Sequence, residues 1–169
     1  DGESTASTTI SSSDSDGFTV GSDAMTNRSS STYVAWNWLA GGSASSDSNG
    51  SITSSVSANT TAGFSIVTYT GDGGGSATIG HGLGVAPSLV IVKARTEPTG
   101  GVHFGTDQGN WVVYVKPPNG IVNETDGALL NKTDDFFDSA VAFNDTAPTS
   151  TVFTIGTADD VNESSDTYV

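Results

Sequence analysis

Cysteine is absent from this chain of 169 residues, so no disulfide bond contributes to its stability. Residues that favour helices are scarce, with a single Met, five Lys and Arg together and few Leu. No apolar run is long enough to cross a bilayer as a helix. Stability must therefore come from side-chain packing and sheet hydrogen bonds, and we expect only a minor helical content.

Basic residues are also few. Five of them face nineteen acidic residues, which gives a net charge of −14. A surface with this charge repels the phosphates of nucleic acids and the headgroups of anionic lipids. We therefore expect no nucleic-acid partner and no membrane insertion.

The residues that are present favour strands. Residues 63–95 contain the two best strand candidates, 64–70 and 89–94, joined by a glycine-rich connection. Other candidates are residues 18–21, 32–40, 52–56, 111–116, 127–130, 151–156 and 167–169, and residues 134–143 suit a strand or a single helical turn. We predict an all-β fold, an antiparallel β-sandwich of jelly-roll-like or immunoglobulin-like type with long polar loops.

Changes in composition divide the chain into three parts. Residues 1–17 are mostly Ser, Thr, Asp and Gly and predict an extended acidic arm, because they bury too little apolar surface to offset chain entropy. Residues 18–62 are interpreted as the end of a preceding β unit plus a linker. Residues 63–169 are interpreted as the main sandwich unit, truncated at its last strand.

Residues 32–40, TYVAWNWLA, are apolar on both faces of a predicted strand, with Trp36 and Trp38 on the same face. We therefore expect this strand to be buried on both sides or to lie at an interface. Tryptophans can also stack on sugar rings, so Trp36, Trp38 and Trp111 are candidate carbohydrate-binding residues, although Trp in β proteins is more often part of the core.

The sequence contains an internal repeat. Residues 18–34, FTVGSDAMTNRSSSTYV, align without a gap with residues 153–169, FTIGTADDVNESSDTYV. Each copy is interpreted as a hairpin: a strand ending at Gly21 or Gly156, a polar loop, and a Thr-Tyr-Val strand. Only the first copy continues into a further apolar stretch. We expect the strand at 167–169 to be completed by more of a longer protein or by an adjacent chain.

Several segments together resemble an uncharacterised β-rich domain of tail-fibre and other virion structural proteins of tailed phages, many of them marine or cyanobacterial. They are YVAWNW (33–38), SANTTAGFSIVTYTG (57–71), GHGLGVAPSLVIVK (80–93), NDTAPTSTVFTIG (144–156) and VNESSDTYV (161–169). The resemblance covers most of residues 18–169. It implies a component of a fibre or virion surface, and it carries over no catalytic residue.

Few residues suggest chemistry. His81, between glycines, could be a metal ligand or a base, but the favoured interpretation is a tight connection in which the histidine bonds to the backbone. The segments beginning at Asp14 and Asp47 resemble the start of calcium loops but lack the third spaced ligand and the closing Glu, so Ca²⁺ at an acidic loop is the less favoured alternative to the absence of a cofactor, and no ligand is named. No pattern for paired carboxylates or an activated nucleophile stands out, and we predict no enzymatic activity and no other cofactor.

Seven N-x-Ser/Thr sequons are candidate glycosylation sites. They lie at Asn27, Asn49, Asn59, Asn123, Asn131, Asn144 and Asn162.

These observations together predict a structural protein of the virion surface, a tail fibre or capsid decoration module, that assembles with copies of itself or other virion proteins through strand edges and its N-terminal arm. The alternatives are a carbohydrate-binding adhesin for host surface glycans and a subunit of a glycosylated cell-surface filament or layer.

Overall fold

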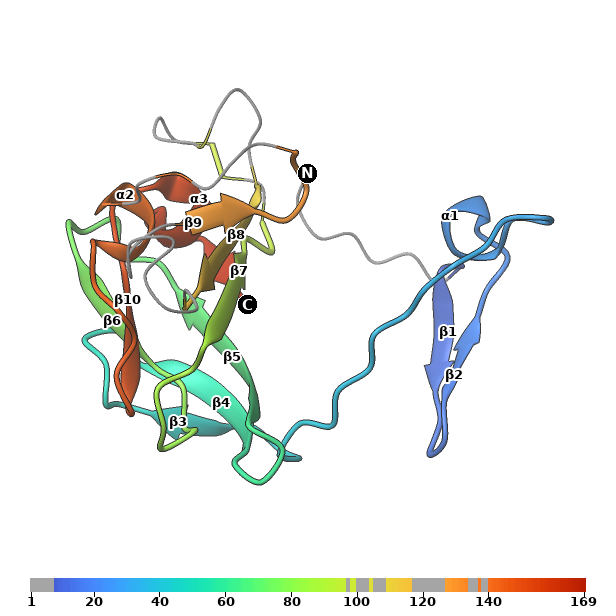
Figure 1. The fold of residues 1–169 in the computed structure, drawn as a ribbon, viewed down its shortest axis with the longest axis horizontal. Helices are drawn as coiled ribbons and strands as arrows, with labels where there is room; N and C mark the ends of the chain where they lie inside the picture. Colours follow the sequence, from blue (N-terminus) through green and yellow to red (C-terminus); the bar gives the residue numbers. More distant parts are fainter. Residues whose placement is uncertain are drawn as a thin grey trace. The chain divides into compact units, whose positions relative to one another are not determined.

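A computed structural model describes residues 8–96, 98–99, 104, 109–116, 127–133, 137 and 140–169. Across these residues the fold is mostly β, with several small antiparallel sheets and three helices of a single turn each (Figure 1). The chain divides into a small unit, Ser4–Trp38, and a large unit made chiefly of Leu39–Val169, which are described separately. The predicted β-rich, antiparallel fold with little helix is confirmed.

The small unit is a hairpin followed by one helical turn. Strand β1 (Ile10–Ser13) pairs with β2 (Phe18–Val20), and α1 (Ala24–Asn27) follows. The Asp14 N–H donates to the Gly17 carbonyl at 2.8 Å, which closes the hairpin turn. Part of the predicted arm over residues 1–17 is therefore a strand, because backbone pairing with β2 compensates for its lack of apolar side chains. Residues 1–7 of that arm lie outside the described residues.

The strand predicted over residues 32–40 is not formed. Residues 31–40 have no regular secondary structure, and Tyr33, Val34, Trp36 and Leu39 are exposed. A strand needs a neighbouring strand to pair with its N–H and C=O groups. Among the strands described in the small unit, β1 and β2 pair only with each other. The expected burial on both faces is therefore not found for residues 32–38 of this unit.

The large unit contains a four-stranded antiparallel sheet with the order β11-β5-β4-β3. Its strands are β3 (Ser45–Asp47), β4 (Ser54–Asn59), β5 (Phe64–Thr70) and the short β11 (Thr167–Tyr168). Strands β4 and β5 form a hairpin whose turn ends at Gly63, with φ of 67°. The predicted boundary between residues 62 and 63 lies in this turn, so residues 45–59 belong to the same sheet as β5.

Two further sheets complete the large unit. One contains β7 (Leu89–Lys93), β8 (Trp111–Val115) and β9 (Gly127–Leu129), and the other pairs β6 (Ala77–Gly80) with β10 (Val152–Ile155). The helices α2 (Ala140–Phe143) and α3 (Asp159–Asn162) flank β10 in sequence. Figure 1 shows β6 and β10 side by side on one flank of this unit.

All three sheets contribute to one apolar core. Its members are Tyr69, Ala77, Ile79, Val92, Ala94, Val112, Tyr114, Leu129, Ala142, Phe143, Phe153, Ile155, Ala158, Val161 and Tyr168. Tyr114 meets Phe143 edge to face with ring centroids 5.8 Å apart. Such aromatic pairs add to the stabilisation that burial alone supplies.

Candidate functional site

The repeated sequence forms the same local structure twice. We call residues 18–34 the first closing element and residues 153–169 the second. In each, a strand ends at a glycine whose N–H donates to a carbonyl 2.7 Å away: Gly21 to Thr9, and Gly156 to Ala142. A Cβ at either glycine would collide with a neighbouring backbone carbonyl. Close backbone approach therefore explains why both copies have glycine here.

After the glycine, both copies make one helical turn and then pass through a serine of positive φ. The turn is α1 in the first copy and α3 in the second. The serines are Ser30, with φ of 64°, and Ser165, with φ of 72°. The prediction that each copy is a hairpin is therefore wrong. The Thr-Tyr-Val segment does not fold back onto its own strand, and β11 pairs with β5 rather than with β10.

A tyrosine hydroxyl binds both ends of each helical turn. The Tyr168 hydroxyl accepts from the Glu163 N–H and donates to the Asp159 carbonyl, both at 2.6 Å. The Tyr33 hydroxyl accepts from the Arg28 N–H at 2.8 Å and donates to the Ala24 carbonyl at 3.1 Å. In each copy the hydroxyl bridges a carbonyl and the N–H four residues later, which are the two groups that bond to each other directly in a continuous α-helix.

The surroundings of the two tyrosines differ. Tyr168 is 0% exposed and stacks on Tyr69 with ring centroids 5.1 Å apart, whereas Tyr33 is 51% exposed. Burial raises the pKa of both Tyr168 and Tyr69. Both rings therefore stay neutral, and the Tyr69 hydroxyl donates to the Val161 carbonyl at 2.8 Å.

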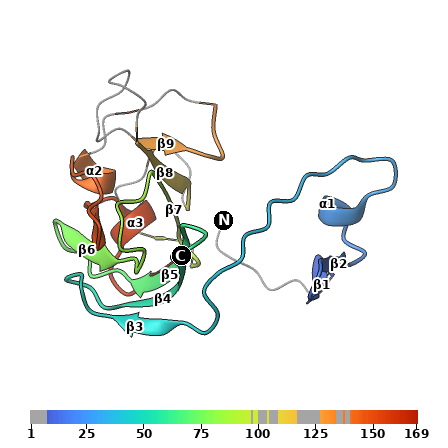
Figure 2. The same ribbon diagram turned by 60° about the horizontal axis from the view of Figure 1, so that its bottom comes forward.

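Strand β11 joins two sheets of the large unit. On one side Thr167 lies opposite Thr70, and Tyr168 lies opposite Tyr69. On the other side Val169 exchanges two backbone hydrogen bonds with Lys93, at 2.8 and 3.0 Å. Figures 1 and 2 show the C-terminus between β5 and β7. The second closing element thus connects the sheet of β3, β4 and β5 to the sheet of β7, β8 and β9.

Beyond this junction, apolar side chains are exposed along both strands. Ile66 on β5 is 42% exposed, and Leu89 and Ile91 on β7 are 53% and 39% exposed. Among the described strands, β5 pairs with β11 only at Tyr69 and Thr70, and β7 pairs along its length only with β8. Sequence reasoning did not identify these three residues, because the alternation that marks strands cannot show which strand edges lie close together.

The three tryptophans are divided between the two units. Trp36 and Trp38 are 71% and 62% exposed and lie in the small unit, while Trp111 is 43% exposed on β8 of the large unit. The Trp111 N–H of the main chain donates to the Asn131 side chain at 3.0 Å. Each of the three side chains is at least partly exposed to solvent, and sugar stacking requires an exposed ring face.

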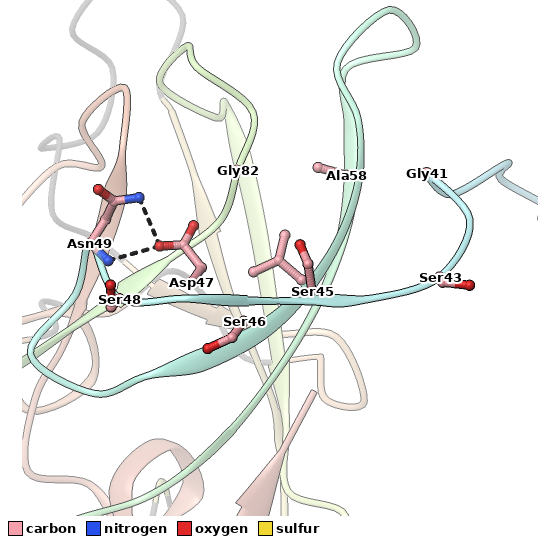
Figure 3. Close-up of a pocket in the computed structure, with 10 residues that line it drawn as sticks. Gly41, Ser43, Ser45, Ser46, Asp47, Ser48, Asn49, Ala58 and Gly82 are labelled. Atoms are coloured by element: carbon pink, nitrogen blue, oxygen red, sulfur yellow. Dashed lines mark hydrogen bonds between the residues drawn. The ribbon is translucent and has the colours of Figure 1, made fainter.

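A polar pocket of about 420 Å³ lies in the large unit (Figure 3). Its walls include the serines of β3, Asp47, Asn49 and Gly82. One Asp47 carboxylate oxygen accepts from the Asn49 N–H at 2.8 Å and from the Asn49 side-chain amide at 2.7 Å. The segment that resembles a calcium loop is therefore a turn closed by its own aspartate.

His81 is buried and bonds to the backbone, as the favoured interpretation expects. Its Nδ1 accepts from the Leu83 N–H at 3.2 Å, so Nε2 carries the proton donated to the Thr149 carbonyl at 3.2 Å. Gly82 and Gly84, with φ of 68° and 74°, form the tight connection. Burial lowers the pKa of His81, although the Thr149 carbonyl and Asp47 partly oppose this effect. The part of the chain that the structure describes contains no group of three or more His, Asp or Glu residues suited to a metal ion.

The sequons differ in accessibility. Asn27, Asn49, Asn131 and Asn144 are exposed and Asn59 is half-buried. Asn162 is 1% exposed, and its amide nitrogen donates to Asp72 at 3.0 Å and to Gly74 at 3.3 Å. The folded protein therefore offers no access for a glycan at Asn162. Asn123 lies outside the described residues.

A buried carboxylate in the second closing element was not anticipated from the sequence. Asp160 is 0% exposed and accepts from the main-chain N–H of Phe104 at 3.0 Å and of Asn110 at 2.9 Å. These bonds tie α3 to the segment that precedes β8. The position equivalent to Asp160 in the first closing element is Met25, which is highly exposed, so no shared sequence signal could have revealed this role.

A family model for a domain of unknown function, DUF7483, matches residues 1–169. The chain belongs to this family. The match places both closing elements of this DUF7483 protein within one family domain. Searches of the curated proteins and of the solved structures gave no match. No helix within the described ranges is both long and apolar enough to span a membrane.

The two tyrosines offer a matched pair of substitutions in this DUF7483 chain. Tyr168→Phe should lower the free energy of unfolding by about 1–3 kcal/mol, because it removes two hydrogen bonds from a fully buried tyrosine to half-buried backbone groups at the ends of α3. Tyr33→Phe removes the equivalent two bonds at an exposed site, where water replaces them. It should lower the free energy of unfolding by no more than about 0.5 kcal/mol. Urea unfolding followed by circular dichroism measures both values. Equal effects of the two substitutions would contradict the role assigned to Tyr168.

His81 should make stability depend on pH. Its pKa is lower in the folded chain than the value of about 6.5 for an unfolded histidine, so the unfolded state binds the proton more tightly. The contribution of His81 is therefore complete above about pH 6.5 and is lost as the pH falls towards its folded pKa. The difference in melting temperature between wild type and His81→Gln should shrink from pH 7.5 to pH 5.5, where Asp and Glu of ordinary pKa remain largely ionised.

The loss of stability that His81 causes between pH 7.5 and pH 5.5 should persist in a His103→Gln variant. This variant removes the chain's other histidine and leaves His81 in place. A difference between wild type and His81→Gln that stays constant over this pH range would show that His81 does not titrate on unfolding as described.

Proposed function

We propose that this chain is a structural module that assembles through β-strand edges at the surface of a larger particle. The observation that carries this proposal is the exposed apolar segment at residues 33–39. Tyr33, Val34, Trp36 and Leu39 are between 51% and 78% exposed. A soluble protein that displays a run of large apolar side chains usually covers them with a partner.

The distribution of charge supports assembly through the same segment. The chain carries a net charge of −14, yet residues 29–46 contain no charged side chain. Interface centres are typically depleted in charged residues and enriched in Trp and Tyr. The negative charge elsewhere disfavours nucleic acid and anionic lipid as partners, so we propose protein partners and no membrane insertion.

For the location, we propose the virion surface, as part of a tail fibre or a capsid decoration, with other virion proteins or copies of the chain as partners. The resemblance of segments such as 57–71 and 80–93 to phage virion proteins supports this placement. The three antiparallel sheets around one core support the finer proposal that the large unit is a sandwich of the jelly-roll-like or immunoglobulin-like type. In this role the chain would act by joining proteins rather than by catalysing a reaction.

A carbohydrate-binding adhesin is the second candidate. Exposed Trp36, Trp38 and Trp111 favour it, because aromatic rings stack on sugars, and the polar pocket beside Asp47 could hold hydroxyl groups. A glycan array separates the two candidates: specific glycan binding that Trp111→Ala abolishes would support the adhesin. A subunit of a glycosylated cell-surface filament would instead carry glycans at the exposed sequons, which mass spectrometry of the native protein detects.

Analytical ultracentrifugation of the purified chain tests assembly. We expect association to strengthen as salt rises from low to physiological concentration, because salt screens the repulsion between acidic chains while apolar contacts persist. Trp36→Ser should weaken the association by roughly tenfold or more, as expected for a central aromatic residue. Trp111→Ser removes an exposed tryptophan from the large unit and should change the strength of association little. A chain that stays monomeric at every salt concentration, or equal effects of the two substitutions, would contradict the proposal.

A further inference from the structure

The polar pocket of the large unit lies at the edge of its four-stranded sheet (Figure 3). In the described part of the chain, β3 is the last strand of that sheet, and no strand pairs with its outer edge. The described residues that line the pocket include six polar side chains, Ser43, Ser45, Ser46, Asp47, Ser48 and Asn49. One short segment therefore supplies hydroxyl, amide and carboxylate groups to the same pocket.

Two of these polar side chains occupy positions on the inward face of the sheet. Ser45 lies opposite Val56 on β4, and Asp47 lies opposite Ser54. Opposite residues of an antiparallel pair point to the same face, and Val56 and Ser54 are only 6% and 3% exposed. Figure 3 shows Ser45 and Asp47 on the same side of β3. Inward positions of a sheet are usually apolar, and departures from this pattern are expected at functional sites.

The Asp47 carboxylate is held in a fixed orientation. One of its oxygens accepts both hydrogen bonds from Asn49. A Cβ at Gly80 would collide with the carboxylate, so the glycine makes room for it. The second oxygen points away from Asn49 (Figure 3), and it has no hydrogen-bond partner among the described residues. A ligand hydroxyl that donates to this oxygen would therefore meet an acceptor that is already oriented.

The pocket also has an apolar part. Val56 and Ala58 of β4 line it together with Gly82 of the connection between β6 and β7. A Cβ at Gly82 would lie 2.9 Å from Val56 Cγ1 and 3.2 Å from Ala58 Cβ, so this connection packs directly against the two side chains. Small-molecule sites typically combine apolar lining with a few well-placed polar groups. A sugar ring matches both parts, because it carries C–H groups on its faces and hydroxyls around its rim.

We propose that this pocket binds a neutral sugar, with one ring hydroxyl donating to Asp47 and an adjacent hydroxyl accepting from the second N–H of the Asn49 amide. The pocket volume of about 420 Å³ lies within the range of about 300–1,000 Å³ found for small-molecule sites. The site does not depend on the assembly role proposed above. It also differs from the tryptophans as a sugar site, because Trp111 is not among the described residues that line the pocket.

Charge favours neutral sugars over other polar ligands. Asp47 is the only charged residue among the described residues that line the pocket, and the chain carries a net charge of −14, so acidic sugars and phosphates are repelled. A Ca²⁺ ion takes about six to eight oxygen ligands, whereas the described residues contain no group of three or more acidic or histidine side chains suited to a metal. A hydroxyl group donates to a carboxylate without bringing a like charge near it.

Titration with methyl α-mannoside, maltose, cellobiose and lactose, followed by amide NMR spectra of the chain, tests the proposal. At least one of these neutral sugars should shift the amide signals of residues 43–49 and Gly82, with a dissociation constant on the order of 1 mM for a single ring. Asp47→Asn should weaken this binding by about tenfold or more. The substitution replaces the oxygen that accepts from the ligand with an amide nitrogen, while the remaining oxygen still accepts from Asn49.

Asp72→Asn is the matched control. The Asp72 carboxylate closes a turn in the same way, by accepting from the Gly74 N–H two residues later at 2.7 Å, but Asp72 is not among the residues that line the pocket. The control removes the same charge and should change the sugar affinity by less than about twofold. Trp111→Ala should likewise leave the affinity unchanged, and circular dichroism checks that each variant is folded.

Several results would overturn the sugar site. One is the absence of amide shifts at residues 43–49 with all four sugars at concentrations up to about 50 mM. Another is sugar binding that Trp111→Ala abolishes and Asp47→Asn leaves intact, which would support an adhesin with a different site. Shifts caused by N-acetylneuraminic acid or CaCl₂ but by none of the neutral sugars would also contradict the proposal.

A change in self-association provides the remaining outcome. If no sugar binds and Asp47→Asn makes the chain aggregate, the inward carboxylate protects the open edge of β3 from pairing with other strands, and the sugar site is overturned. Association measured by ultracentrifugation with the Trp36→Ser variant tests the assembly role separately, so failure of one proposal leaves the other standing.

Discussion

The large unit depends on a short strand that joins two sheets which do not pair directly. Strand β11 bonds to β5 on one side, and the residues around it bond to Lys93 and Arg95 on the other. A strand this short contributes few hydrogen bonds, so its place is fixed mainly by the buried Tyr168. The ring stacks on Tyr69, and the hydroxyl holds both ends of α3. The side chain of Tyr168 therefore both fills space in the core and supplies hydrogen-bond partners to the backbone of α3.

The two closing elements show which parts of their conformation come from the local sequence and which depend on packing against the rest of the chain. Both copies have the glycine against a carbonyl, the single helical turn, the serine of positive φ and the tyrosine hydroxyl bonded to the turn. The local sequence therefore specifies this conformation even where the tyrosine is half exposed. Burial requires a receiving pair of strands, which the large unit supplies to the second copy. This difference is the physical basis for expecting the first copy to have a partner.

Sequence reasoning located strands where apolar and β-branched residues are dense, as in β5, β7 and β8. It missed β1, β3 and β6, because Ser-rich and Gly-rich segments such as residues 45–47 gain strand structure from pairing rather than from their own side chains. It also placed residues 32–40 in a strand on apolar character alone. The role of His81 followed from its glycine neighbours, whereas the buried Asp160 and the exposed Ile66 and Ile91 depend on which distant segments meet.

Amide hydrogen exchange at Lys93 and Arg95 tests most directly whether β11 holds the two sheets together. These N–H groups donate to the Val169 and Thr167 carbonyls, each at 2.8 Å. If β11 is an integral strand, both amides should exchange as slowly as those of the buried β8 residues, through global unfolding. Exchange near the rate of an unstructured peptide, with β8 still protected, would show that the closing strand detaches freely and would contradict the account.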